Sequence, residues 1–356
     1  MKILYTYFGL MQRVGGVSRY FHENILRIQN TEEVTVCSLF CSNEYFKNYF
    51  KRIWFSPKSQ ILIYLRIISE EIFQWLNLNF SRYDIVHLTA DRISVFRYTK
   101  KPVITTIHDM IPELFCTNPK TIARRKQSIW KSQGIVCVSN NTKKDLLRIY
   151  PQIPQSKITV IHHGYDARKY DYKREYKFRY ILYVGTRKEN YKNFIPFVNS
   201  VAPLLLKHRL MLVCTGAFFN KTEQSAFNSL GIEKNVVDCG CVSEQQLANL
   251  YHYAECFVYP SKYEGFGIPI LEAFCHQTPA CISNASCFPE VGGDAVAYFN
   301  PDDTNSIREC VNKVIIDAEY RNYLVNKGIQ RLKKFTWEKA AQKHIQFYNS
   351  IINNSR

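Results

Sequence analysis

The sequence lacks the features expected of a secreted, disulfide-linked or membrane-spanning chain. Its 12 cysteines are scattered singly along 356 residues and form no Cys-x-x-Cys pair, which favours free thiols in a reducing compartment. No hydrophobic run approaches the roughly 18 to 20 residues that a transmembrane helix needs. The apolar stretch after Met1 is too short for a secretory signal and has no small-residue cleavage site. We therefore expect a cytoplasmic chain, either in solution or peripheral on the cytoplasmic face of the plasma membrane.

Three further absences concern metals and cofactors. The nearest cysteine pairs, Cys37 with Cys41 and Cys239 with Cys241, have no partner pair at metal-ligand spacing, which argues against a zinc site. The pattern Gly-x-Gly-x-x-Gly never occurs, which disfavours a nucleotide-dependent oxidoreductase. No segment indicates a lysine that would hold pyridoxal phosphate, as a sugar phosphorylase would need. The sequence thus predicts neither a metal nor a bound cofactor.

Acidic residues are scarce relative to basic ones, and the imbalance lies in the first half of the chain. The net charge is +17, and residues 1–175 carry 27 Lys and Arg against 14 Asp and Glu. Residues 176–356 carry 20 against 16. Such a field attracts nucleic acid, an anionic membrane or a charged substrate without specifying which. Solvated Lys and Arg side chains on surface helices would give the same count.

Short apolar runs alternate with helical patterns along the whole chain. The runs are nearly continuous, as in strands of a parallel sheet that is covered on both faces. We expect strands at residues 3–8, 34–40, 85–88, 103–108, 135–139 and 158–162, and again at 180–184, 210–214, 236–238, 256–259, 279–282 and 295–299. This alternation predicts an α/β fold with two doubly wound domains.

The domain boundaries follow from changes in composition. Residues 166–178 are polar and charged with little apolar periodicity, so we expect a linker there. One domain then covers residues 1–165 and the other residues 179–335. Residues 336–356 carry apolar side chains at spacings of three and four, which predicts a terminal amphipathic helix.

Residues 45–80 interleave aromatic, aliphatic and basic side chains. Helices that lie in the headgroup region of a membrane have this composition, because bulky apolar groups enter the bilayer while cations face anionic lipid. A wall of an acceptor-binding site packed inside the first domain would look similar. The segment therefore predicts either membrane contact or an acceptor wall.

A first chemical motif follows the strand expected at residues 180–184. Gly185 allows close backbone approach, and Arg187 and Lys192 flank the start of the next helix, whose amides favour anions. Ligands of open α/β sheets bind at such strand ends, so we expect a phosphate or diphosphate here. An ordinary basic loop is the alternative.

A second motif begins where the strand at 256–259 ends. Gly265 and Gly267 permit a loop close to a ligand, and Pro269 suits a first helical turn. Glu264 precedes the glycines and Glu272 follows in the helix. Carboxylates accept hydrogen bonds from hydroxyl pairs, so the two glutamates could hold a sugar and a ribose.

These glutamates, with seven residues between them and followed by Cys287-Phe288-Pro289-Glu290-Val291-Gly292-Gly293, resemble the retaining glycosyltransferases of family 4. The resemblance is strongest from residue 180 to residue 301. It implies the GT-B fold, in which two Rossmann-like domains face a central cleft and a C-terminal helix crosses back to the first domain. The first domain would bind the acceptor and the second the nucleotide sugar.

The resemblance also implies which residues form the site. His108, before Asp109 at a strand end, would touch the donor sugar, and Arg187 and Lys192 would stabilise the leaving diphosphate. Glu264 would orient the sugar. The donor-binding set that the resemblance implies is Gly15, Gly16, Gly185, Gly240, Cys241, Val242, Gly265, Phe266, Gly267, Ile268 and Glu272. Two positions depart from the family pattern: Arg187 stands two residues after Gly185, and Asn193 replaces a glycine. A shift of one residue could therefore place another cation at the diphosphate.

The implied reaction is metal-independent transfer of a hexose, with retention, from a GDP- or UDP-sugar to a hydroxyl of a glycan or lipid-linked glycan. The setting would be O-antigen, capsule or lipopolysaccharide synthesis, with an anionic membrane surface as a further partner and no nucleic acid. A basic membrane or nucleic-acid adaptor without catalysis is the alternative. It accounts for the charge but leaves the Glu264 and Glu272 motif unexplained.

Overall fold

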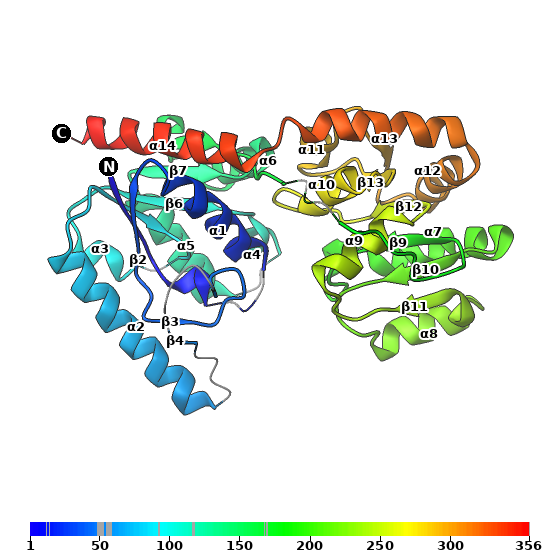
Figure 1. The fold of residues 1–356 in the computed structure, drawn as a ribbon, viewed down its shortest axis with the longest axis horizontal. Coiled ribbons are helices and arrows are strands. Elements are labelled where there is room, and N and C mark those ends of the chain that lie inside the picture. The colour runs from blue at the N-terminus through cyan, green and yellow to red at the C-terminus, as the bar shows by residue number, and fades with distance from the viewer. Residues whose placement is uncertain are drawn as a thin grey trace. The chain divides into compact units, whose positions relative to one another are not determined.

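The computed structural model describes residues 1–11, 13, 15–47, 59–91, 93–115, 118–166, 168 and 170–355, and the backbone of residues 53–54. The chain divides into two compact units. Unit 1 consists of Met1–Gly164 together with Thr336–Arg356, and unit 2 of Tyr165–Phe335. Each unit is built around its own parallel sheet (Figure 1).

Unit 1 contains a six-stranded parallel sheet in the order β2-β1-β5-β6-β7-β8. Its strands are β1 (Lys2–Tyr5), β2 (Glu33–Val36), β5 (Ile85–Leu88), β6 (Val103–Ile107), β7 (Gly134–Cys137) and β8 (Ile158–Val160). Its helices are α1 (Gly16–Ile28), α2 (Gln60–Phe80), α3 (Val95–Tyr98), α4 (Ile111–Leu114), α5 (Pro119–Lys131), α6 (Asn140–Ile149) and α14 (Trp337–Asn354). A separate two-stranded sheet pairs β3 (Phe40–Cys41) with β4 (Ile53–Trp54).

The unit 1 sheet buries both of its faces, because successive side chains of each strand point to opposite sides. Ile3 and Tyr5 of β1 join one cluster with residues of α1 and α14. Leu4, between them, joins a second cluster with residues of α2 and α3. This explains why the sequence shows continuous apolar runs instead of alternation.

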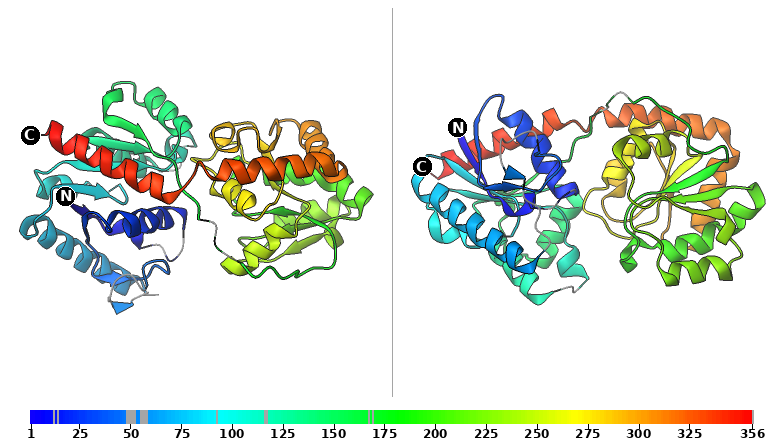
Figure 2. Two further views of the ribbon diagram at one scale, coloured as in Figure 1. Left: turned by 45° about the horizontal axis from the view of Figure 1, so that its top comes forward. Right: turned by 60° about the horizontal axis from the view of Figure 1, so that its bottom comes forward.

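The C-terminal helix α14 completes the core of unit 1. It lies beside α1, as Figures 1 and 2 show, and Trp337 and Tyr348 are fully buried. The Tyr348 hydroxyl lies 2.9 Å from that of Tyr5 and 2.6 Å from Nδ1 of His87. The return of the chain to the first sheet is therefore held by both packing and hydrogen bonds.

Unit 2 repeats the architecture with the strand order β11-β10-β9-β12-β13-β14, again all parallel. Its strands are β9 (Tyr180–Tyr183), β10 (Met211–Cys214), β11 (Val236–Asp238), β12 (Cys256–Tyr259), β13 (Ala280–Ser283) and β14 (Ala297–Phe299). Its helices are α7 (Phe194–His208), α8 (Lys221–Ser229), α9 (Glu244–His252), α10 (Ile268–Cys275), α11 (Phe288–Gly292), α12 (Thr304–Ile316) and α13 (Ala318–Leu332).

The two doubly wound sheets and the returning helix confirm the predicted fold class. Each of the twelve predicted strands overlaps a strand of the six-stranded sheets. The β3–β4 pair was not predicted, because two-residue strands carry no periodic signal. Of the segment 45–80, residues 48–52 and 55–58 lie outside the described residues, residues 53–54 form β4, and α2 forms residues 60–80. No helix in the described part of the chain is both long and apolar enough to span a bilayer.

Candidate active site

Unit 2 has its topological switch point between β9 and β12. Strand β9 lies in the middle of the sheet, with β10 on one side and β12 on the other. In open α/β sheets a ligand binds beyond the carboxyl ends of the strands at such a point. Gly185 and Lys192 follow β9, and Glu264 follows β12. The topology therefore brings the two sequence motifs to one edge of the sheet.

Lys192 and Glu264 form an ion pair at this edge. The Lys192 ammonium lies 2.7 Å from Oε1 of Glu264, and the side chains are only 16% and 13% exposed. The amide of Lys262 donates to the carbonyl of Tyr191, which joins the two loops through the backbone. On the Glu264 backbone, the carbonyl accepts a 2.7 Å hydrogen bond from the Ser286 hydroxyl. A cation suited to phosphate and a carboxylate suited to hydroxyls are thus held together.

Helix α10 carries the second glutamate. Gly267 precedes the helix with φ +92°, and a Cβ there would lie 3.1 Å from the ring of Phe288, so the turn requires glycine. Glu272 is buried and accepts a hydrogen bond from the Tyr251 hydroxyl at 3.1 Å. Burial, and then the Glu272 carboxylate, raise the pKa of Tyr251, so this hydroxyl keeps its proton and remains a donor.

Arg187 is enclosed by its own unit. Its side chain is only 2% exposed, and Nε donates to Oε1 of Glu223 at 2.9 Å. Its terminal nitrogens donate to the carbonyls of Thr215 and Ala217, and its guanidinium lies 4.7 Å from the centre of the Phe219 ring. The charge and the hydrogen-bond donors of Arg187 are therefore already engaged in holding the turn between β10 and α8. A diphosphate, the predicted partner of Arg187, would compete with these contacts.

The loops after β9, β10 and β11 approach each other through glycines. A Cβ on Gly216 would lie 2.5 Å from the carbonyl oxygen of Gly185, and the Gly216 amide donates to the carbonyl of Gly240. All three have positive φ. Phe218, which is 78% exposed, lies against Gly240, and Cys241 beside it is also exposed. No sequence signal pointed to Phe218, because a single exposed phenylalanine in a loop forms no pattern.

Unit 1 has the corresponding switch point between β1 and β5. A cavity of about 440 Å³ lies there. The residues that line it include Phe8, Gly9, Thr89, Asp91, Thr106 and His108. Only glycine fits at position 9, where the chain passes close to Thr89. A Cβ on residue 9 would lie 2.1 Å from the carbonyl oxygen of Thr89.

His108 lies at the end of β6 and lines this cavity. Its Nε2 is buried and has no hydrogen-bond partner among the described residues. Burial, with a smaller contribution from the Arg125 charge, lowers the pKa of His108 to about 3. The imidazole is therefore neutral at physiological pH and offers a ligand one hydrogen bond rather than a charge.

Arg125 of α5 braces the turn after His108. Its Nε donates to Glu113 at 2.9 Å, and a terminal nitrogen donates to the Asp109 carbonyl at 2.6 Å. Asp91, across the cavity lining, lies 3.8 Å from the guanidinium. Burial raises the pKa of Asp91, which Arg125 partly offsets. The wall that holds His108 is thus a network anchored on one arginine.

Gly15 and Gly16 lie at the start of α1, where Gly15 is the N-cap and Gly16 the first helical residue. The φ of Gly15 is 175°, an extended conformation that any residue adopts. The predicted contact of this pair with a diphosphate therefore gains no support from backbone strain, although the α1 amides begin here.

Two models of known families match the chain, and together they span nearly all of it. The model described as Glycosyltransferase Family 4 matches residues 14–169, and that described as Glycosyl transferases group 1 matches residues 168–331. The chain belongs to glycosyltransferase family 4. The family comprises retaining transferases, and the division between the two models falls close to the boundary between units 1 and 2.

Individual relatives of this family-4 chain agree. O-antigen chain mannosyltransferase B of Escherichia coli is 31% identical over 179 residues, covering 48% of this chain and 46% of its own length. The O-antigen chain mannosyltransferase RfbU of Salmonella typhimurium is 28% identical over 240 residues, covering 64% and 66%. The chain thus matches about half the length of the first relative. The solved structure of Anabaena HepE with UDP and glucose has the same fold, with a TM-score of 0.75 at 14% identity, covering 98% and 100%.

The structure separates the site residues implied by the family-4 resemblance into two groups. Unit 2 gathers the residues after β9 and β12 around the Lys192–Glu264 pair, with Gly265, the buried Phe266, Gly267 and Ile268 forming the turn into α10. Gly240, Cys241 and the half-buried Val242 lie in the loop after β11. Gly15, Gly16 and His108 belong to unit 1.

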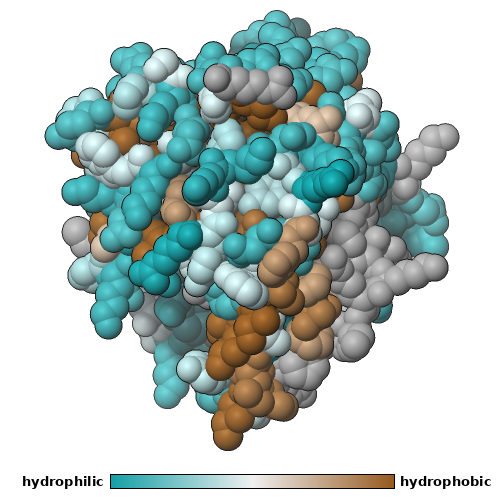
Figure 3. Space-filling view, turned by 90° about the vertical axis from the view of Figure 1, so that its left-hand side faces the viewer, coloured by the Kyte–Doolittle hydropathy of each residue, from teal (hydrophilic) through white to brown (hydrophobic). Residues whose placement is uncertain are grey.

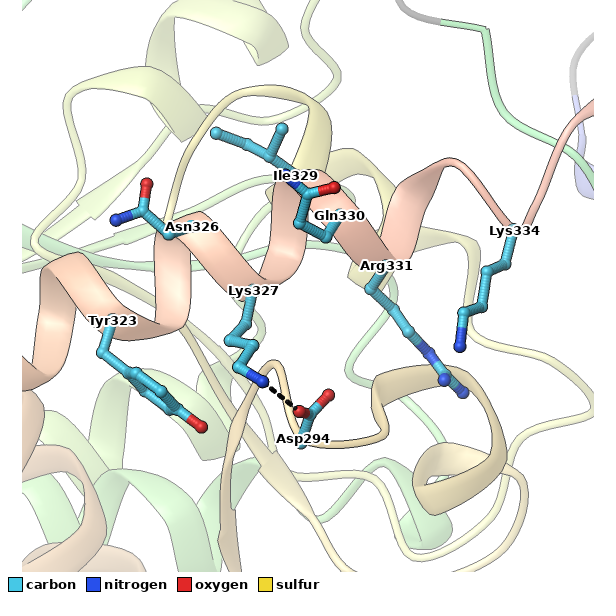
Figure 4. A pocket seen from close by; sticks show the side chains of 8 residues that line it. All are labelled: Asp294, Tyr323, Asn326, Lys327, Ile329, Gln330, Arg331 and Lys334. Atoms are coloured by element: carbon cyan, nitrogen blue, oxygen red, sulfur yellow. Dashed lines mark hydrogen bonds and ion pairs between the residues drawn. The ribbon is translucent and has the colours of Figure 1, made fainter.

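Another hollow, of about 620 Å³, lies along α13 and contains none of these residues. Figure 4 shows its side chains, with Lys327 paired to Asp294 at 2.7 Å. Arg331 donates to the carbonyls of Glu290 and Val291, so its donors serve the end of α11. Among the described residues no group of three or more His, Cys, Asp or Glu side chains is placed to hold a metal ion.

Proposed function

We propose that this chain transfers a hexose, with retention, from a nucleoside-diphosphate sugar to a hydroxyl of a glycan or lipid-linked glycan. The Lys192–Glu264 pair at the switch point of unit 2 carries the proposal. A half-buried cation suits a diphosphate leaving group, and a carboxylate beside it suits sugar hydroxyls. The names of the relatives support mannose as the hexose and O-antigen or a related surface polysaccharide as the product.

The roles within unit 2 follow from these contacts. Lys192 stabilises the charge that grows on the diphosphate, and the amides at the start of α10 add their dipoles. Glu264 orients the sugar, and Glu272 accepts hydrogen bonds from the ribose. Arg187 acts as a positioning residue, because Glu223 neutralises it where it holds the β10–α8 turn. The loop around Gly240, with Phe218 beside it, receives the base.

The reaction replaces one bond at the anomeric carbon by another on the same face of the sugar. The bond to the diphosphate oxygen breaks, and the bond to the acceptor oxygen forms. The donor phosphate takes the acceptor proton. Neither glutamate is a covalent nucleophile in this scheme, and the reaction needs no metal ion.

Unit 1 supplies the acceptor pocket. Its cavity has an apolar wall, and His108 offers one hydrogen bond without a charge, which suits a sugar hydroxyl better than a phosphate. His108 is therefore proposed to orient a hydroxyl of the reacting sugars.

Diphosphate binding tests the donor site directly. GDP, UDP, ADP and TDP are added in excess EDTA, and the midpoint of thermal unfolding is followed. A ligand at 100 times its dissociation constant adds about 2.7 kcal/mol of stability. We expect one base to stabilise the protein selectively. Lys192→Met should then weaken binding of that diphosphate about 10- to 100-fold, because it removes a hydrogen-bonded charge.

Lys188→Met is the matched control, since it removes one exposed charge from the same loop. It should change the affinity less than threefold. Equal losses in both variants would mean that the loop attracts anions only by net charge. Failure of all four diphosphates to stabilise the protein, with EDTA or with added magnesium, would reject the donor site.

A further inference from the structure

Helix α2 presents its apolar side to the surface. Nine of its large hydrophobic side chains are exposed, with Ile61 and Phe80 exposed by about three quarters and Leu65 and Ile72 by more than half. Figure 3 shows the side of the molecule on which α2 lies, and hydrophobic side chains gather on its lower part. The outward side of α2 carries no charged residue. This is the reverse of an ordinary surface helix.

The polar side of α2 is fixed inward. The Glu70 carboxylate accepts hydrogen bonds from the amides of Leu39 and Phe40, at 2.7 and 3.0 Å, and from the Ser38 hydroxyl at 3.1 Å. Glu71 accepts from the Tyr7 hydroxyl at 3.1 Å. Turning the helix to bury its apolar side would carry Glu70 outward and leave the partly buried amides of Leu39 and Phe40 without their acceptor, which is costly. The helix is therefore built to keep its apolar side outward.

A basic hollow lies at the C-terminal end of α2. It has a volume of about 660 Å³ and is lined by Leu78 of the helix together with Lys2, Arg82, Lys100 and Lys101. Arg82, Lys100 and Lys101 are exposed. An uncharged apolar face that ends in cations matches a bilayer with anionic headgroups. A second copy of this chain fits less well, because its net charge of +17 would repel these cations.

The inner side of α2 reaches the cavity of unit 1. Ile67 lines that cavity together with His108 and Thr106. A single helix thus has an outer face suited to lipid and an inner face in the wall of the pocket. A bilayer at the outer face would bring the pocket to the membrane surface.

We propose that α2 lies in the headgroup region of an anionic bilayer, and that Arg82, Lys100 and Lys101 bind lipid headgroups beside it. The pocket that contains His108 then receives the saccharide of a lipid-linked acceptor while the lipid stays in the membrane. This last step rests on the proposed function, whereas the docking itself does not.

Vesicle flotation tests the docking with the full chain. We expect the protein to float with vesicles of phosphatidylcholine containing 30% phosphatidylglycerol and to float about tenfold less with phosphatidylcholine alone. Leu65→Glu with Ile72→Glu should reduce binding to the anionic vesicles at least tenfold, because charges on this face oppose entry into the headgroup region. The matched control is Leu206→Glu with Ile316→Glu, two exposed apolar positions of unit 2, which should float like the unaltered protein.

Charge reversal tests the second part of the surface. Lys100→Glu with Lys101→Glu should lose most of the preference for anionic vesicles, since each basic residue near such a surface is worth about fivefold in binding. Absence of flotation by the unaltered protein would overturn the proposal. So would sedimentation as a dimer that Leu65→Glu with Ile72→Glu converts to monomer, because a second copy would then cover the face.

Calorimetric binding of the preferred nucleoside diphosphate separates this proposal from the proposed function. The α2 variants should bind it as the unaltered protein does, which also shows that they are folded. A protein that floats but binds no nucleoside diphosphate would keep the docking surface and lose the transferase donor site. A protein that binds the diphosphate but does not float would do the reverse.

Discussion

Units 1 and 2 share a sheet topology, but different kinds of structure surround their switch points. Every described residue with φ between about +20° and +160°, whether glycine or not, lies in unit 2. There the loops after β9 and β12 hold the Lys192–Glu264 pair, and the loop after β10 passes close to the loop after β9. In unit 1 the same edge is a cavity walled by side chains around the neutral His108. The topology decides where a site forms, and the loops decide whether it suits an anion or an uncharged hydroxyl.

The largest expected effect concerns the arginine that braces each site. Arg187→Met should lower the free energy of unfolding of unit 2 by about 3 to 5 kcal/mol, because it leaves Glu223 buried without its partner. Urea titration followed by circular dichroism should show an earlier transition. The four tryptophans all lie in unit 1, so their fluorescence should keep its original midpoint.

Arg125→Met provides the matched change in unit 1, where it breaks the pair with Glu113. Here the fluorescence transition should move to lower urea. If Arg187→Met left stability unchanged and instead weakened diphosphate binding, the arginine would belong to the donor contact and not to the brace.

The next largest expected effect is that of acidification, which should lower the stability of unit 1 more than that of unit 2. Burial lowers the pKa of His108 to about 3 and that of His344 to about 4, and holds those of His87 and His163 well below 6.5. Because the unfolded chain takes up these protons below pH 6.5 and the folded unit does not, stability is lost as the pH falls. Between pH 6.5 and 5.5 each histidine should cost about 1 kcal/mol.

Unit 2 has one buried histidine with a comparable shift, His276, whose pKa burial lowers to about 4. Tryptophan fluorescence in urea at pH 6.5 and at pH 5.5 should therefore show a marked loss of stability in unit 1. His344→Gln should reduce this pH dependence by about a quarter. An equal loss in both units would contradict the comparison.

A smaller effect is expected at Glu272. Glu272→Gln should weaken binding of the preferred nucleoside diphosphate about tenfold, since a hydrogen bond to a charged acceptor is lost. Binding of inorganic pyrophosphate, which has no ribose, should stay within twofold. Calorimetry with both ligands measures the difference, and a parallel loss would place Glu272 near the diphosphate.

The smallest expected effect is at His108. His108→Ala should lower the rate of transfer about five- to tenfold, the size of one neutral hydrogen bond, without changing diphosphate affinity. His108→Gln, which keeps a hydrogen-bonding end, should recover part of the rate. Weaker diphosphate binding in His108→Ala would tie this residue to the donor phosphates.

The sequence was sufficient to predict the two sheets, because buried parallel strands leave continuous apolar runs. It was also sufficient to predict that Lys192 and Glu264 lie at the same edge of a sheet, because both follow such strands. It could not show that Arg187 is buried against Glu223, since the two residues are 36 positions apart and both look like surface charges. Gly216 gave no signal for a similar reason, because its close contact with Gly185 depends on the packing of two loops. The apolar residues of α2 were compatible with both predicted roles, membrane contact and an acceptor wall. The contacts of Glu70 in the structure show which side of the helix faces outward.

The return of α14 to unit 1 also sets an order for synthesis. A ribosome synthesises all of unit 2 before it makes Trp337 and Tyr348, so unit 2 can begin to fold before unit 1 is complete. Unit 1 begins first, but the apolar residues of α1 that pack against α14 stay uncovered until α14 is made. For most of its time on the ribosome the nascent chain therefore displays an unfinished apolar surface, where chaperones have their opportunity to bind.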